Sequence, residues 1–118
     1  MRIISARRLR EFYREHAGAE APLKEWIKRV EKAEWRQFAD VRMTFPAADQ
    51  ITVVARRRVV SATGKAFIQR ITKTVVIFNV GGNNFSLIAS INYSTGIAYT
   101  LFALTHAEYS RRAWKEQL

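Results

Sequence analysis

Apolar positions recur with a helical period over the first part of the chain. One stripe, which ends before Gly18, predicts a first helix, and a second stripe after Pro22 predicts another, because proline suits the first turn of a helix. The first repeat consists of Arg8, Leu9, Phe12, Tyr13 and His16, and the second of Leu23, Trp26, Ile27 and Val30. Residues 2–5 fit a short strand, and residues 33–45, which Pro46 ends, predict a short helix or turn.

The pattern changes after Ile51 to runs of β-branched and aromatic residues. Four such runs predict strands, and the turn-forming residues between them make short links of the kind that join antiparallel neighbours. The runs are 51–60, 66–80, 85–93 and 97–104. Thr105 and Glu108 then have the spacing of a capping box, so a final helix is expected. The predicted fold is α+β: an antiparallel sheet packed against two N-terminal helices, with a short C-terminal helix.

The composition is that of an ordinary globular protein, since 48% of the 118 residues are hydrophobic and 25% are charged. This length predicts a single domain over residues 1–118. The absence of cysteine excludes disulfides and thiolate chemistry. The charged N-terminus lacks the apolar core of a secretory signal, and no window approaches the length of a transmembrane span. We therefore expect a cytoplasmic protein with no membrane partner.

The charge is strongly unbalanced, with 20 Lys and Arg against 10 Asp and Glu and a net charge of +10. On so small a surface, this excess attracts phosphodiesters, anionic membranes or an acidic protein partner. Nucleic acid is the leading candidate, although composition alone leaves all three open.

Three blocks of sequence carry a resemblance to a known family. They are residues 1–49 (MRIISARRLREFYREHAGAEAPLKEWIKRVEKAEWRQFADVRMTFPAAD), 76–93 (VIFNVGGNNFSLIASINY) and 105–115 (THAEYSRRAWK). In this order and with this spacing, they resemble the HigB family of toxins from type II toxin-antitoxin modules, within the RelE/ParE-like superfamily.

The resemblance implies a RelE-like fold and the activity of an mRNA endonuclease, or mRNA interferase. In such families, cleavage is typically metal-independent and occurs on translating ribosomes, and a helix-turn-helix antitoxin of the HigA type neutralises the toxin. We therefore expect mRNA, the ribosome and such an antitoxin as partners, with no metal and no small-molecule cofactor.

The chain departs from the family pattern at three positions. Ser86 and Leu101 stand where the family often carries a basic residue, and Ser110 replaces a common Asp. The segment around residues 50–73 is longer than in the family and predicts an added hairpin-like insertion rich in Lys and Arg. Either this insertion returns basic charge to the RNA-binding face, or the chain is a catalytically weakened homologue that only binds an antitoxin, RNA or the ribosome.

Metal-free RNA cleavage needs acid–base groups and at least one cation, because the 2′-hydroxyl of the substrate attacks the adjacent phosphate. The catalytic candidates are His106, Tyr109 and Lys73. A histidine titrates near neutrality, but His106 can equally be a structural residue in the first turn of the last helix. Tyr109 supplies a phenol or stacks on a base, or else it is a core residue of an amphipathic helix.

The RNA-binding candidates are Arg70, Arg56, Arg58, Asn83 and Asn84. Strand alternation places Arg56 and Arg58 on one face and Arg57 on the other, and it separates Arg70 from Lys73. Each of these cations can also be a solvated surface charge. The two asparagines follow two glycines, so their first expected role is to adopt a turn conformation.

Two further alternatives remain open. The arginines of the first helix face ribosomal RNA or simply solvent; they are Arg7, Arg8, Arg10 and Arg14. Without the resemblance, the interpretation is a generic basic RNA-binding or ribosomal accessory protein.

Overall fold

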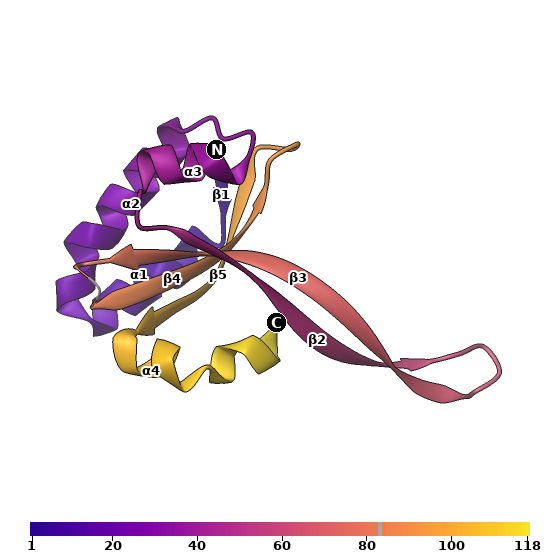
Figure 1. The fold of residues 1–118 in the computed structure, drawn as a ribbon. Helices are drawn as coiled ribbons and strands as arrows, with labels where there is room; N and C mark the ends of the chain where they lie inside the picture. Colours follow the sequence, from indigo (N-terminus) through magenta and orange to yellow (C-terminus); the bar gives the residue numbers. More distant parts are fainter. Residues whose placement is uncertain (83) are drawn as a thin grey trace.

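The computed structural model describes residues 1–82 and 84–118, which form a five-stranded sheet with helices on both faces (Figure 1). The helices are α1 (Ala6–Glu15), α2 (Glu20–Lys32), α3 (Phe38–Thr44) and α4 (His106–Arg111), with the 3-10 helices η1 (Ala17–Ala19) and η2 (Ala113–Gln117). The strands are β1 (Arg2–Ile4), β2 (Asp49–Val60), β3 (Ala66–Val80), β4 (Phe85–Asn92) and β5 (Ile97–Thr105). The predicted α+β class is confirmed. None of the described helices is long and apolar enough to cross a membrane.

The strands lie in the order β1-β5-β4-β3-β2. Strands β2 to β5 are antiparallel neighbours, as predicted, but β1 runs parallel to β5, with Ile3 opposite Ala98. The sheet is therefore mixed, and the prediction of a wholly antiparallel sheet is wrong at this edge. A three-residue strand has no hairpin to fix its direction, which depends on where the helices return the chain. Because β1 pairs with β5 only as far as Tyr99, the rest of β5 is a free edge.

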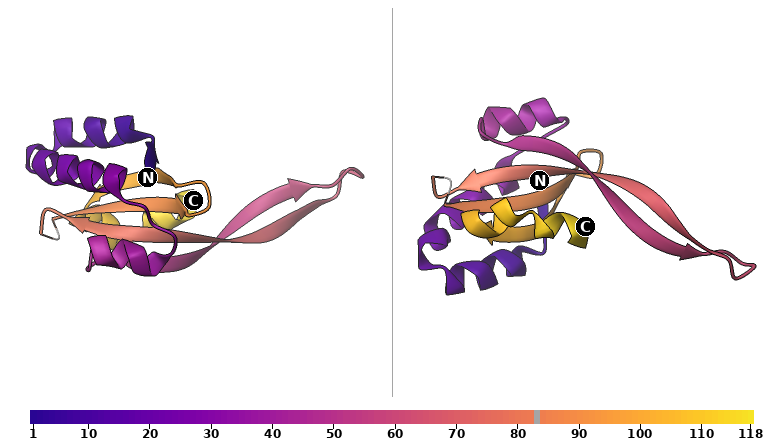
Figure 2. Two further views of the ribbon diagram at one scale, coloured as in Figure 1. Left: turned by 90° about the horizontal axis from the view of Figure 1, so that it is seen from above. Right: turned by 60° about the horizontal axis from the view of Figure 1, so that its bottom comes forward.

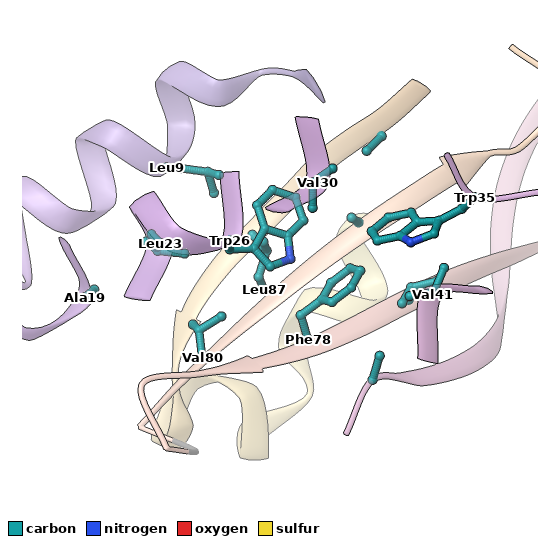
Figure 3. Packing of buried hydrophobic residues seen from close by; sticks show 14 residues of the cluster. Leu9, Ala19, Leu23, Trp26, Val30, Trp35, Val41, Phe78, Val80 and Leu87 are labelled. Carbon is teal, nitrogen blue, oxygen red and sulfur yellow. The ribbon is translucent and has the colours of Figure 1, made fainter. Parts of the chain in front are cut away.

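The first three helices pack on one face of the sheet and bury the main core. Leu9 of α1, Trp26 of α2 and Val41 of α3 are almost fully buried, together with Phe78 of β3 (Figure 3). The Trp26 and Phe78 rings meet edge to face, with centroids 5.3 Å apart. The helical stripes predicted from periodicity are thus the buried faces, and they give the sheet a rigid support.

The C-terminal segment crosses the opposite face (Figure 1). The Thr105 hydroxyl accepts a hydrogen bond from the Glu108 N–H at 3.2 Å, and the Glu108 carboxylate accepts one from the Thr105 N–H at 3.0 Å. The predicted capping box is therefore confirmed. Beyond α4, Trp114 is only 3% exposed and packs in a second, smaller cluster with Val75 and Ile88. This cluster covers the sheet less completely than the main core does.

The β2–β3 hairpin extends beyond the sheet as a two-stranded ribbon. Strand β3 pairs with β4 only from Val76 onward, so its earlier part pairs with β2 alone. We call residues 54–72 the arm. Figure 1 and Figure 2 show that the arm leaves the body and twists, and the molecule has a longest dimension of 52 Å. The predicted hairpin-like insertion is thus a projecting arm.

Candidate functional site

A cavity of about 620 Å³ lies on the sheet face that the C-terminal segment covers. Strands β3, β4 and β5 provide most of its lining, and Arg8 of α1 and Leu118 border it as well. The polar and aromatic side chains that line it include Lys73, Ser90, Tyr99 and Phe102. The cavity therefore combines cations, hydroxyl groups and aromatic rings.

A β-bulge directs two neighbouring residues of β5 toward this face. Ile88 lies opposite Phe102, but Ala89 lies opposite Thr100, which leaves Leu101 as an extra residue. Because the bulge interrupts the strand alternation, Leu101 and Phe102 both pack with the second cluster and line the cavity. Thr100 instead turns to the other side, where its hydroxyl donates to the main-chain oxygens of Ile4 and Ser5 at 3.1 and 2.8 Å.

Two cations border the cavity without an Asp or Glu partner among the described residues. The Lys73 ammonium donates a hydrogen bond to the main-chain oxygen of Leu118 at 2.7 Å, and an ammonium has two further donors. Arg8 forms no ion pair in the described part of the chain, whereas its neighbour Arg7 pairs with Glu11 at 2.9 Å. Lys73 and Arg8 can therefore bind an anion placed in the cavity.

The surrounding sequence adds no negative charge. Residues 50–107, which include nearly all of β2 to β5, contain no Asp or Glu but six Lys and Arg. Among the residues that the structure describes, no three His, Asp or Glu side chains gather as a metal-ligand group. The electrostatic potential over this part of the sheet favours phosphate groups.

The structure separates two of the predicted catalytic residues, Lys73 and His106. Thr105 lies opposite Phe85, which in turn lies opposite Val80, so His106 follows the end of the sheet at Val80. Lys73 precedes Val80 by seven residues on β3, a distance of about 23 Å along an extended strand. The two side chains therefore do not share one phosphate.

His106 begins α4 and is exposed, and its N–H donates to the main-chain oxygen of Asn84 at 3.1 Å. The Asn84 N–H in turn donates to the Gly81 oxygen at 3.2 Å, and Gly81 has a φ of +64° that suits glycine. Asn84 thus has a turn role, as the Gly-Gly-Asn-Asn pattern predicts. Asn83 lies outside the described residues.

Tyr109 is half-buried and belongs to the second cluster. Its ring stacks on Trp114 with centroids 5.7 Å apart and an interplanar angle of 15°. Its main-chain oxygen accepts a hydrogen bond from the Trp114 indole at 3.2 Å. These contacts match the packing role that was one of the two alternatives for Tyr109, and the residue does not line the cavity.

The predicted RNA-binding arginines lie on the arm. Arg56 is directly opposite Arg70, and Arg58 is opposite Ile68, so all three arginines share one face of the ribbon. Arg57 and Lys73 point to the other face, which confirms the alternation expected from the sequence. The arm arginines and Lys73 therefore belong to two different surfaces.

Sequence reasoning missed Tyr99 and Ser90, which line the cavity opposite each other on β5 and β4. Tyr99 is 38% exposed in the structure. The one signal that the sequence offers for it is a phenol within a mostly apolar run. Of the three departures from the family pattern, the two that replace a basic residue fall on the same face. Leu101 lines the cavity, and Ser86 is buried in β4 two residues from Ile88.

A comparison of the sequence with models of protein families gives a match. The model of the family described as HigB_toxin, RelE-like toxic component of a toxin-antitoxin system, matches residues 19–66 and 66–112. A comparison with curated proteins found no match. The matched segments contain α2 to α4 and strands β2 to β5, and they meet at Ala66 in the hairpin. Since they span most of its length, the chain belongs to the HigB family of RelE-like toxins of toxin-antitoxin systems.

Proposed function

We propose that the chain is an mRNA interferase, a metal-independent endoribonuclease that cuts mRNA on the ribosome and so inhibits translation. The observation that carries the proposal is the pair of cations, Arg8 and Lys73, on the border of one cavity in a member of a toxin family. Neither cation pairs with an Asp or Glu side chain in the described part of the chain, and Lys73 keeps two N–H donors beyond its bond to Leu118, so both can bind a phosphodiester.

The proposed reaction uses the substrate's own 2′-hydroxyl as the nucleophile. Its oxygen forms a bond to the adjacent phosphorus as its proton leaves to a base, and the bond from phosphorus to the 5′-oxygen breaks. The leaving oxygen takes up a proton, and the products are a 2′,3′-cyclic phosphate and a 5′-hydroxyl. Negative charge grows on the nonbridging oxygens during this step, so cations placed beside them accelerate it.

The cavity residues divide these roles. Arg8 and Lys73 hold the phosphate and stabilise its developing charge. Tyr99 stacks on a base or donates its phenolic proton, and Phe102 adds a second ring to the lining. His106 is too far from Lys73 to act on the same phosphate, and we assign it to flanking RNA. Tyr109 supports catalysis only by holding the C-terminal segment on the sheet.

Family membership implies an antitoxin partner. We propose that this antitoxin is a helix-turn-helix protein of the HigA type, and that the toxin acts in the cytoplasm, where its mRNA and ribosome targets are. The net charge of +10 supports contacts with both nucleic acid and an acidic antitoxin.

A second candidate function is binding without cleavage. Leu101 lines the cavity where the family often has a basic side chain, and the buried Ser86 stands on the same face. Without a basic side chain at position 101, the cavity would hold RNA with less stabilisation of the transition state. The chain would then be a module that binds its antitoxin, RNA or the ribosome.

Inducible expression in cells, with mapping of RNA ends, separates these candidates. Wild-type protein is expected to stop growth and to produce new mRNA ends, whereas Lys73→Ala and Arg8→Ala reduce both effects. Arg7→Ala is the matched control, because Arg7 adjoins Arg8 but pairs with Glu11. If the wild type produces no new ends, the cleavage proposal fails and binding alone remains.

A further inference from the structure

The arm exposes aliphatic side chains beside its arginines. Six large hydrophobic side chains are exposed among the described residues, and four of them lie on the arm: Val54, Val60, Phe67 and Ile68. Val60 and Ile68 are each 62% exposed. Isolated exposed apolar residues need no explanation, but a group on one projection indicates an interaction surface.

The strand register sorts most of these side chains onto one face of the ribbon. The Thr52 and Thr74 hydroxyls lie 3.2 Å apart across the pair and mark this face. Counting in steps of two from these threonines gives a continuous apolar-basic strip. Its larger apolar and basic members are Val54, Arg56, Arg58, Val60, Ile68 and Arg70, and the smaller Thr72 and Ala66 lie on the same face. The two-stranded ribbon twists along its length (Figure 2). The strip must therefore wind around the arm with it.

The charges on the apolar-basic strip lack compensation within the arm. Arg56 and Arg70 lie directly opposite each other, an arrangement in which like charges repel. The arm itself contains no Asp or Glu, and Arg56 borders a hollow of about 490 Å³ together with Val54, Lys115 and Glu116. That hollow holds one carboxylate, Glu116, against two cations, Arg56 and Lys115, so its net charge remains positive. A partner that brings carboxylates would therefore relieve the repulsion.

The aliphatic side chains decide which kind of anion fits. A phosphodiester backbone would form charged contacts with the arginines, but it would not remove the apolar surface of Val54, Val60 or Ile68 from water. A protein segment could form both kinds of contact, because its apolar side chains would cover the valines and Ile68 while its carboxylates pair with the arginines. A second copy of the arm is disfavoured, since its own arginines would repel those of the first.

We propose that the apolar-basic strip is a docking site for the antitoxin, and that it binds a segment that alternates carboxylate and apolar side chains. This assigns the arm arginines to a protein partner in place of RNA. The inference rests on the toxin-antitoxin family, which implies the partner, and not on RNA cleavage.

The experiment measures the affinity of the purified cognate antitoxin for the full-length chain by calorimetry, without RNA. Arg56→Gln is expected to weaken binding about tenfold, because it removes a charge-assisted contact. Its matched control is Arg57→Gln, an equal charge change on the opposite face, with an expected loss of less than about twofold. The combined change Val60→Thr and Ile68→Thr keeps strand propensity and is also expected to weaken binding about tenfold.

Three results would overturn the proposal. In the first, Arg57→Gln weakens binding as much as Arg56→Gln, so that only overall charge matters. In the second, the threonine substitutions leave the affinity unchanged. In the third, Arg56→Gln weakens binding of a single-stranded RNA oligonucleotide but not of the antitoxin, which makes the arm an RNA contact. Because antitoxin binding is measured without RNA, failure here is distinguishable from failure of the proposed nuclease activity.

Discussion

Arg8 of α1 and Lys73 of β3 border the same cavity, although one residue comes from the first helix and the other from the longest strand. The short β1 makes this possible, because it leaves β5 uncovered beyond Tyr99 and α1 lies beside the open edge. The cavity thus has one cation from α1, which lies beside the edge strand β5, and one from β3 within the sheet.

This arrangement predicts how RNA binding depends on salt. Each cation that contacts a phosphate displaces counterions, so Lys73→Gln or Arg8→Gln is expected to reduce the slope of log affinity against log salt by about 0.7. Titrations of single-stranded RNA at several salt concentrations measure the slope. Arg7→Gln serves as the control, and a reduction as large as that of Arg8→Gln would contradict a specific role for the cavity.

A basic residue at position 101 is expected to strengthen the site. Leu101 lines the cavity at the β-bulge, so Leu101→Arg places a third cation beside Arg8 and Lys73. A charge-assisted contact predicts about a tenfold gain in RNA affinity. Filter binding measures this, with Leu101→Met as the control for lost packing. An unchanged affinity in a folded Leu101→Arg protein would place the RNA elsewhere.

The sequence predicted most of the fold because local signals are strong there. Turn residues bound every long strand, and the apolar stripe of α2 matches the buried side that includes Trp26 and Val30. The direction of β1 was predicted wrongly, since three residues without a hairpin carry no signal of their pairing. Alternation also sorted Arg56, Arg58 and Arg57 correctly between the two faces of the ribbon.

The candidate site was less predictable because it depends on register across strands. The sequence identified Lys73 and His106 but not their separation, which follows from the pairing of Val80 with Phe85 and of Phe85 with Thr105. The bulge that directs Leu101 toward the cavity has no glycine or proline to announce it. The position of Arg8 depends on packing between distant segments, which no local pattern encodes.

Trp114 is expected to hold the C-terminal segment on the sheet. It is 3% exposed, it stacks on Tyr109, and its ring centroid lies 6.5 Å from that of Phe102. Trp114→Ala is expected to lower the free energy of unfolding by about 3 kcal/mol, as for other large buried aromatic residues. Urea denaturation measures the change, and Trp114→Phe should lose less. Equal stability of Trp114→Ala and wild type would show that the segment contributes no packing.

The capping box predicts a pH-dependent contribution from Glu108. The hydrogen bond from the Thr105 N–H is the main cause that lowers the pKa of Glu108 from its ordinary value of 4.5. A carboxyl group with a lowered pKa stabilises the folded state above its ordinary pKa, and it loses this effect as the pH falls through the folded-state pKa. Glu108→Gln should therefore be less stable than wild type near about pH 7, and the difference should shrink near about pH 3.

Urea denaturation of wild type and Glu108→Gln at the two pH values measures whether their stability difference shrinks toward acid pH. Thr105→Ala removes the other half of the box and is expected to cost about 1 kcal/mol near neutral pH. A stability difference between Glu108→Gln and wild type that grows toward acid pH would contradict the role of the charged carboxylate.

The most direct test of the proposed RNA site is photo-crosslinking of a single-stranded RNA that contains 4-thiouridine to the purified chain, with the crosslinked residues identified by mass spectrometry. Crosslinks are predicted at the cavity, above all at Tyr99 and Phe102, and they should diminish in Lys73→Gln. Crosslinks confined to the arm or to the helix-covered face, and unchanged in Lys73→Gln, would contradict the account.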